Sequence, residues 1–433
     1  MSNQAFVRTE MLPEQHPPAT TVGVIGWLRE NLFSGWFNSI LTVVSLAFVY
    51  YVLSGILPWI FQSAWNADSL NECREIFIAT WGSTEGHACW GVVNERWLQL
   101  LYGFYPSDLY WRVNLTLVVT LIAMAPVLFS DQAPRQLWYV TAVYPFVMPW
   151  LLWGGSIWGP LMAAAGFGIG YLAYRVLVPV AGSLVAVIGA VVLPILWWFA
   201  LAGTVAGAIQ GIIPIGIESV ESRQFGGFML AVLLGIVAIG CSLPIGIVLA
   251  LGRQSDLLIV KALCVGFIEF IRGVPLITLL FVASLLLNLF LPPGTNFDII
   301  LRVMIMMTLF AAAYMAEVIR GGLAALPKGQ YEGADSLGLN YWQAQRLIIM
   351  PQALKISIPG IVSTFIGIFK DTTLVSIIGL FDVIGLSNAI RADTAWNGIY
   401  WELFAFIAFL FFIVCFSMSR YSMYLERKLH TGH

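Results

Sequence analysis

The sequence predicts an all-α protein that crosses a membrane many times. Hydrophobic residues make up 59% of its 433 residues, charged residues make up 10%, and the mean hydropathy is +0.86. A soluble domain is closer to half apolar and a quarter charged. Apolar runs long enough to cross a hydrocarbon layer of roughly 30 Å recur about ten times. We therefore expect a polytopic membrane protein with about ten transmembrane helices.

The chain opens with a polar segment, residues 1–36, which contains Pro13, Pro17 and Pro18. It lacks a short apolar core followed by a small-residue cleavage site, so it does not read as a signal peptide, and we expect a flexible tail. The predicted spans follow near 37–61, 113–129, 137–155, 158–178, 182–206, 226–251, 264–291, 299–322, 358–380 and 401–420. Very short turns between the third, fourth and fifth spans leave the boundaries between 137 and 206 open.

The distribution of positive charge predicts how the spans are oriented. With the amino terminus inside, about twice as many Lys and Arg residues lie on the cytoplasmic side as on the outer side, which is the usual bias. Both termini are then cytoplasmic, and the long polar loop 62–112 is periplasmic. The polar insert 323–355 falls in the cytoplasm. We accordingly divide the chain into the tail 1–36, a membrane extension 37–219 and a membrane domain 220–427.

Two cysteines, Cys73 and Cys89, share the loop 62–112. Cysteines about sixteen residues apart in a translocated loop predict a disulfide bond, since that compartment is oxidising. Two free thiols remain the alternative.

The sequence also excludes several functions. It has no Gly-rich loop ending in Gly-Lys-Ser/Thr, so we do not expect it to hydrolyse ATP. All four histidines fall in polar segments, and a haem-carrying membrane subunit would need them within spans. No Cys/His spacing predicts a zinc site, and the net charge of −2 argues against nucleic acid. We expect no catalytic residue, no metal and no cofactor.

The insert 323–355 predicts two short helices outside the membrane. The first begins after Pro327 and Gly329, with Glu332 in its first turn, where a carboxylate suits the helix dipole. Gly338 provides a left-handed stop. Asn340 is placed to cap the second helix, with Gln343 in the capping-box position.

Four motifs carry a resemblance to a known family. The insert contains Glu332-Gly333-Ala334-Asp335-Ser336-Leu337-Gly338. The others read Phe270-Ile271-Arg272-Gly273-Val274-Pro275-Leu276, Ala316-Glu317-Val318-Ile319-Arg320-Gly321-Gly322 and Lys370-Asp371-Thr372-Thr373-Leu374-Val375-Ser376-Ile377-Ile378-Gly379. They resemble the polar amino acid branch of ATP-binding-cassette importer permeases, and the chain is similar to general L-amino acid importer permeases. The family pattern is Glu-Ala-Ala, three variable positions, then Gly. Here Gly333 replaces the first alanine, at about 1 kcal/mol of helix propensity.

The resemblance covers about residues 220–427 and implies how the protein works. The last five spans would form a type I importer permease core in the bacterial inner membrane. Expected partners are a second, homologous permease, two ATP-binding-cassette ATPase subunits, a periplasmic amino-acid-binding protein and the amino acid substrate. The residues expected to couple to the ATPase are Gln330, Glu332, Gly333, Ala334, Asp335, Leu337, Gly338, Pro351, Gln352 and Ala353.

Charged residues within the predicted spans are candidates for the translocation path, because each costs upward of about 2.5 kcal/mol in the bilayer. Glu269 with Arg272, and Glu317 with Arg320, are spaced to form pairs on one helix face. Interfacial anchoring is the alternative for both pairs. Lys370 and Asp371 lie about halfway along their span. The path candidates are Glu269, Arg272, Glu317, Arg320, Thr364, Lys370, Asp371 and Thr372.

Three prolines, Pro244, Pro275 and Pro359, interrupt apolar runs, and a broken helix would free backbone groups for a polar solute. Packing kinks are the alternative. An ion-coupled secondary transporter is the rival function. It predicts inverted repeats and a buried carboxylate cluster, neither of which the sequence shows, and it leaves the insert unexplained. A purely structural membrane factor would not need charges within its spans.

Overall fold

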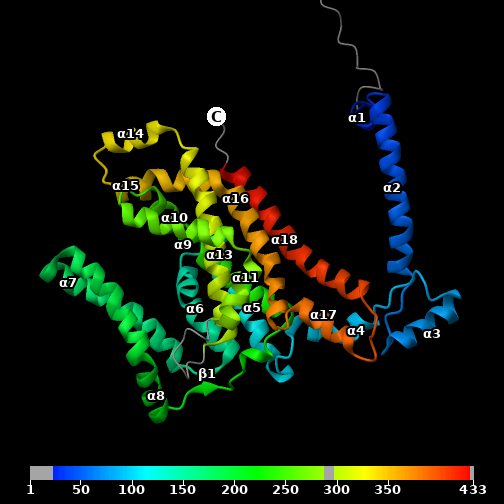
Figure 1. Ribbon diagram of the computed structural model, residues 1–433, viewed down its shortest axis with the longest axis horizontal. Helices are drawn as coiled ribbons and strands as arrows, with labels where there is room; N and C mark the ends of the chain where they lie inside the picture. The colour runs from blue at the N-terminus through cyan, green and yellow to red at the C-terminus, as the bar shows by residue number, and fades with distance from the viewer. Residues whose placement is uncertain (1–22, 287–296, 430–433) are drawn as a thin grey trace, which may run out of the picture. The chain divides into compact units, whose positions relative to one another are not determined.

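The computed structural model describes residues 23–286 and 297–429, and these are helical apart from loops and one two-stranded ribbon (Figure 1). Contacts divide the chain into two compact units, Met1–Asn94 and Glu95–His433. This division lies elsewhere than the predicted boundary near residue 219. That boundary concerns the part of the chain that resembles the family, and it stays a prediction. Most of the predicted tail, residues 1–22, lies outside the described residues.

The first unit is a lone membrane helix followed by a folded polar segment. Its helices are α1 (Gly23–Asn31), α2 (Trp36–Phe61), α3 (Leu70–Trp81) and the start of α4 (Gly91–Tyr102). The end of the predicted flexible tail is therefore helical, since it contains α1. Helix α2 is apolar on all sides, and none of its most apolar window is buried within the protein, so lipid or another protein must cover it.

The part of the predicted loop 62–112 that belongs to the first unit, residues 62–94, is folded and not irregular. Helix α3 is capped by Ser69, whose side chain accepts from the Glu72 amide, and ends at the left-handed Gly82. A disulfide joins Cys73 of α3 to Cys89, with their Cα atoms 5.9 Å apart. The bond closes the segment before α4, where a small apolar core alone would stabilise it weakly.

The second unit begins with the rest of the extension. Its elements are η1 (Ser107–Leu109), α5 (Tyr110–Leu128), α6 (Leu137–Trp153), β1 (Gly155–Ser156), α7 (Trp158–Leu196), η2 (Trp197–Leu201), α8 (Ala202–Ile212) and β2 (Gly216–Ile217). Helices α5 and α6 form a hairpin in which the Thr141 hydroxyl donates to the Ala123 carbonyl at 2.6 Å. Strands β1 and β2 pair antiparallel and close the α7–α8 segment.

The remaining helices build the membrane domain around α13. They are η3 (Ser222–Gln224), α9 (Gly227–Gln254), α10 (Leu258–Gly273), α11 (Leu276–Phe281), η4 (Val282–Leu286), α13 (Ile299–Ala324), α14 (Lys328–Ser336), α15 (Tyr341–Ala344), η5 (Gln345–Ile349), α16 (Met350–Asp371), η6 (Thr372–Ile378), α17 (Val383–Ala392) and α18 (Trp401–Leu429). In Figure 1, α14 and α15 lie together near the ends of α13 and α16 that they connect.

Small residues let α13 pack closely against α9 and α16. A side chain at Gly246 of α9 would clash with Met315, and one at Gly322 of α13 would clash with the Ala353 carbonyl of α16. In lipid the hydrophobic effect does not hold helices together, and the van der Waals contacts that small residues allow take its place. In α13, 61% of the most apolar window is buried, the highest share among the described spans.

The predicted fold class is confirmed, with differences in the individual spans. Across the described parts of the chain, seven helical segments are long and apolar enough to cross a membrane, and α10 with α11 and η4 forms an eighth, bent by 102°. Helix α6 is shorter, at 17 residues. The spans predicted at 158–178 and 182–206 form one segment, Trp158–Ile212, broken at Gly182, where φ is 81° and ψ is 172°. The predicted runs overlap helices within the described residues, but they form fewer spans than predicted, and residues 287–291 of the run 264–291 lie outside the described residues.

Residues 95–153 are built into the membrane domain. The buried Arg112 guanidinium donates to the Glu218 carbonyl at 2.6 Å, and Trp153 stacks on Phe225 with ring centroids 4.4 Å apart. On α4, Glu95 accepts from the indole of Trp396 at 2.8 Å and Arg96 pairs with Asp393 at 3.0 Å. Trp396 is fully buried, so this part of the extension holds the loop between α17 and α18.

We predict that Cys73 and Cys89 are oxidised in protein extracted from the membrane. Mass spectrometry after thiols are blocked should find the reagent on Cys241 but not on Cys73 or Cys89, because Cys241 is free and exposed. Recovery of Cys73 and Cys89 carrying the reagent would exclude the bond and argue against an outer position for this segment.

The burial of Asp382 makes us expect that the stability of the fold depends on pH. It caps α17 by accepting from the Gly385 amide at 2.9 Å, but it is fully buried, and burial raises the pKa of its carboxyl from 3.8 to about 6. Between those values the folded protein binds more protons than the unfolded chain. Stability therefore falls as pH rises from about 4 to about 6, by roughly 3 kcal/mol in total, and the loss persists at pH 7.

We expect Asp382→Asn to remove this dependence and to raise the unfolding temperature at pH 7, because an amide oxygen still caps the helix. Asp298 caps α13 in the same way but is exposed, so Asp298→Asn is the matched control. Thermal unfolding in detergent at pH 4.5 and pH 7 measures both. An unchanged pH dependence in Asp382→Asn would contradict the assignment.

Candidate functional site

Five charged side chains gather near the ends of three membrane helices. Arg253 of α9 contacts Glu317 of α13 at 2.5 Å and Glu269 of α10 at 2.9 Å, both through Nη1. Arg320 contacts Glu317 at 2.8 Å, and Arg272 lies 3.7 Å from it. We call these five residues the arginine cluster. It holds one more positive than negative charge.

Glu317 is the centre of the arginine cluster. Its side chain is 15% exposed, while the other four are between 23% and 53% exposed. Removing a carboxylate from water costs several kcal/mol. The three guanidinium groups around Glu317 offset this cost. Glu317 lies seven residues before the end of α13, roughly 10 Å along the axis.

The structure corrects one predicted pair and retains the other. Glu317 and Arg320 are paired, as their spacing predicts. Glu269 is paired with Arg253 on another helix, and Arg272 is directed to Glu317 instead of Glu269. Arg253 is not among the predicted site residues, and in the sequence it counts only toward the positive charge of the cytoplasmic side. Its place in the last turn of α9 was visible, but its partners lie 16 and 64 residues away.

A break in the membrane segment follows the arginine cluster directly. Helix α10 ends at Gly273 and α11 starts at Leu276, with a bend of 102° between them. Pro275, whose backbone is extended, precedes the new helix, where its missing amide proton costs nothing. Pro244 and Pro359, in contrast, lie inside the continuous helices α9 and α16, so only Pro275 breaks a span as predicted.

Lys370 and Asp371 are predicted to lie about halfway along their span, but the structure places them at the end of α16. The Ser357 hydroxyl donates to the Val318 carbonyl at 3.2 Å, so Ser357 lies level with the arginine cluster. Lys370 follows thirteen residues later, roughly 20 Å further along the helix. The structure therefore separates the predicted path residues into two groups. The reason is that α16 starts earlier than the apolar run, within the insert.

The two candidate threonines bond to their own helices. Thr364 donates to the Gly360 carbonyl at 2.9 Å, and the buried Thr372 donates to the Phe369 carbonyl at 2.7 Å. Thr364 lies between the arginine cluster and Lys370 along α16, and its oxygen can still accept a hydrogen bond.

The first helix of the insert stops at Gly338 as predicted but starts earlier than predicted. Helix α14 begins at Lys328, so Glu332 lies in its second turn and not in its first. Pro327 supplies the extended residue before the helix, so the helix starts two residues earlier than a start after Gly329 would give. Gly338 has a φ of 68°, the left-handed conformation that its stop requires.

The second helix of the insert is the start of a membrane span and not a separate helix. Asn340 and Gln343 form the predicted capping box. From there the helix runs without interruption from Tyr341 to Ile378, through the wider turn η5. Pro351 lacks the amide proton that would bond one turn back, which favours a widened turn at this point.

Side-chain contacts fix α14 against α16. The Gln352 amide donates to Gln330 at 2.9 Å and to the Ile348 carbonyl at 2.9 Å. Ala334 and Ala353 are buried, while Glu332, Gly333, Asp335, Leu337, Gly338 and Pro351 are exposed. The predicted coupling residues thus divide into a buried set that holds the insert and an exposed set that faces outward.

Comparison with known proteins identifies the family. The family model described as "Binding-protein-dependent transport system inner membrane component" matches residues 242–431. The glutamate/glutamine/aspartate/asparagine transport system permease protein BztC of Rhodobacter capsulatus is 59% identical over 435 residues, covering 100% of both chains. The chain belongs to this family of inner membrane components. The predicted resemblance to ATP-binding-cassette importer permeases is therefore confirmed.

Two further comparisons extend over different parts of the permease. The inner membrane amino-acid ABC transporter permease protein YhdY of Escherichia coli is 40% identical over 425 residues, covering 96% of this chain and 97% of that one. A solved structure, described as the crystal structure of an amino acid ABC transporter with histidines, is 30% identical with a TM-score of 0.42. It covers 46% of this chain and 91% of the solved one.

The permease also exposes large apolar side chains that the sequence did not single out. Leu337, Tyr341, Trp342 and Leu347 of the insert are between 52% and 74% exposed. Their positions lie in a polar region, and their exposure depends on how α14 and α15 turn after Gly338. Only Leu337 was among the predicted coupling residues.

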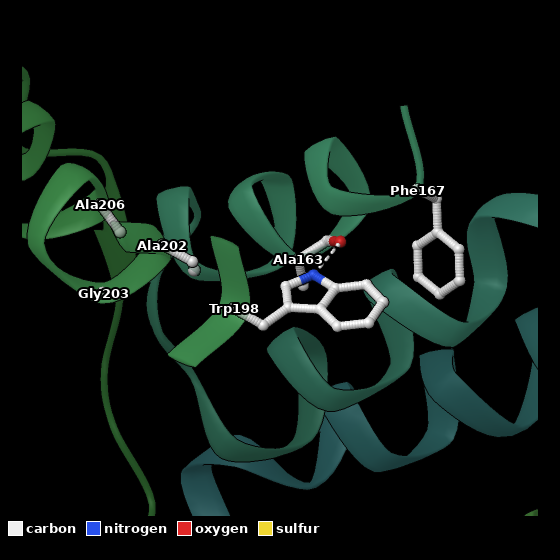
Figure 2. Close-up of a pocket in the computed structure, with 7 residues that line it drawn as sticks. Ala163, Phe167, Trp198, Ala202, Gly203 and Ala206 are labelled. Carbon is white, nitrogen blue, oxygen red and sulfur yellow. Dashed lines mark hydrogen bonds between the residues drawn. The ribbon is translucent and has the colours of Figure 1, made fainter. Parts of the chain in front are cut away.

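A separate hollow of about 400 Å³ lies between α7, η2 and α8 (Figure 2). Phe167, Trp198 and five small residues line it, and the Trp198 indole donates to the Ala163 carbonyl at 3.0 Å. Because its lining carries no charged side chain, it does not resemble a site for a polar solute, and it belongs to the extension of the permease.

The two charged groups predict different effects of substitution. Glu317→Ala leaves three arginines around a missing carboxylate, so we expect less assembled protein, by roughly 3–5 kcal/mol of stability. Lys370 is exposed on the surface of this chain and its neighbour Asp371 is only partly buried, so we expect Lys370→Ala to assemble normally and to change uptake. Quantifying folded protein by size-exclusion chromatography, and uptake per folded molecule, measures both. Unchanged uptake in both Lys370→Ala and Asp371→Ala would contradict a role of these two residues in translocation.

Proposed function

We propose that this chain is a transmembrane subunit of an ATP-driven importer for amino acids. The main support is full-length similarity to permeases whose names specify acidic amino acids and their amides, or amino acids in general. The substrate class is accordingly polar amino acids. ATP hydrolysis takes place on a separate chain, because this sequence lacks a phosphate-binding loop.

The insert is the surface that meets the ATPase. Leu337, Trp342 and Leu347 are apolar, exposed and outside the hydrocarbon in the predicted orientation, where a partner would have to cover them. The partly buried hydrogen bond from Gln352 to Gln330 keeps α14 fixed on α16. A force applied to the exposed set would then move α13 and α16 together instead of only bending the insert.

The path runs between the two charged groups of the membrane domain. Lys370 and Asp371 lie toward the outer side in the predicted orientation, and the arginine cluster lies toward the cytoplasm. An amino acid carries one positive and one negative group, and each charged group of the protein offers both signs. Alternating access would expose the solute first to one side and then to the other by rigid-body movement.

The partners follow from the same function. A second, homologous permease completes the path, two ATPase subunits drive it, and a periplasmic binding protein delivers the amino acid. The membrane is the bacterial inner membrane, with both termini in the cytoplasm. Reconstitution in liposomes with the proposed partners tests the whole assignment: ATP-dependent uptake of glutamate, glutamine, aspartate or asparagine supports it. Uptake driven by an ion gradient without ATPase would refute it.

We predict that Gly338→Asp uncouples transport. Any side chain at a φ of 68° is strained, and an added carboxylate lies beside the exposed apolar residues. The turn shifts at a cost of roughly 1–2 kcal/mol, so insertion into the membrane should be normal while uptake falls at least tenfold.

Gly82→Asp is the matched control for Gly338→Asp. Gly82 also ends a short helix, with a φ of 74° and no atom within 4 Å of an added Cβ, but it belongs to the outer segment. Its substitution imposes the same strain away from the insert and should leave uptake near the original level. Normal uptake by Gly338→Asp would exclude the docking assignment.

A further inference from the structure

Arg253 links three helices through one guanidinium group. One of its nitrogens bonds both Glu269 of α10 and Glu317 of α13, while Arg253 itself ends α9. We infer that Arg253 is the positioning residue that transmits the movement of α14 to the break between α10 and α11. This inference rests on the function proposed above.

The route from the insert to Arg253 is short. Helix α13 ends at Ala324, and α14 begins at Lys328. Glu317 lies roughly two turns before that end, so a displacement of α14 reaches it through a continuous helix. From Glu317 the ion pair passes the displacement to Arg253, and from Arg253 to Glu269.

The link acts on a helix that buries little of its surface within this chain. Only Ile268 and Ile271 of its 16 residues are buried, and Leu258, Ile259 and Leu263 are at least 69% exposed within this chain. A helix with so narrow a packed strip can slide along its neighbours. Glu269 lies four residues before Gly273, where the 102° bend begins, so the link acts next to the break.

The other two arginines of the cluster do not replace Arg253. Arg320 bonds Glu317 from the same helix, which neutralises charge but joins no helices. Arg272 does join α10 to α13, at a longer distance of 3.7 Å, and its guanidinium also lies 5.7 Å from the Tyr314 ring centroid. Arg253 alone among these three reaches two carboxylates on two different helices at hydrogen-bonding distance.

The test measures the number of ATP molecules hydrolysed per amino acid transported, in the reconstituted complex. For Arg253→Gln we expect this ratio to rise roughly fivefold or more, the size of a typical coupling between two sites. Glu269→Gln, at an exposed position that leaves folding intact, should raise it in the same direction. Arg253→Lys keeps the charge and should restore most of the coupling.

Two comparisons separate a link between helices from a general effect of charge. Lys261→Gln removes a positive charge from an exposed position of α10, and it should leave the ratio unchanged. The double variant Arg253→Gln/Glu269→Gln should be no worse than Arg253→Gln alone, because both changes cut the same link. Arg320→Gln should change the preference between acidic and neutral substrates more than it changes the ratio.

The outcomes distinguish this inference from the proposed function. A complex that transports amino acids with an unchanged ratio in both Arg253→Gln and Glu269→Gln would overturn the role of Arg253 alone. Independent, multiplying effects of the two substitutions would also overturn it. A complex that transports no amino acid with the original sequence would overturn the proposed function instead.

Discussion

A carboxylate within a membrane domain has to be neutralised, and the C-terminal ends of three helices are arranged around Glu317 for this purpose. Arg253, Arg272 and Arg320 approach it from α9, α10 and α13. Because a buried unpaired charge costs several kcal/mol, the pairing also fixes the distances between these helices. The break before α11 and the insert after α13 both begin within a few turns of this point, so their positions depend on it.

The rest of the membrane domain keeps α13 in position. Glycines at 246 and 322 allow α9 and α16 to approach its backbone, and the capping box at Asn340 starts the helix that becomes α16. The insert is therefore continuous with two of the most closely packed helices. A partner bound to the exposed Leu337 and Trp342 would act on a rigid lever, and this suits a protein that converts movement on one side of the membrane into movement within it.

The extension also contributes to the stability of the membrane domain. Glu95 and Arg96 hold the loop that contains Trp396 and Asp393, and Arg112 and Trp153 hold the segment before α9. Residues 95–153 thus stabilise the loop between α17 and α18 and the segment before α9. In contrast, α2 and the α7–α8 segment bury little of their apolar surface within this chain. Lipid or another subunit must cover them, which is consistent with a protein that works in an assembly.

The sequence by itself determined the features that local rules control. Apolar length set the spans, Gly338 and Asn340 set the ends of the insert helices, and Pro275 set the break. These depend on residues within one or two turns. Only the tertiary structure decided that Glu269 pairs with Arg253, that Ser357 lies level with Glu317 and Lys370 roughly 20 Å further along α16, and that Trp342 is exposed. Arg253 meets Glu317 across 64 residues and Glu95 meets Trp396 across 301, because helix packing and not spacing along the chain brings them together.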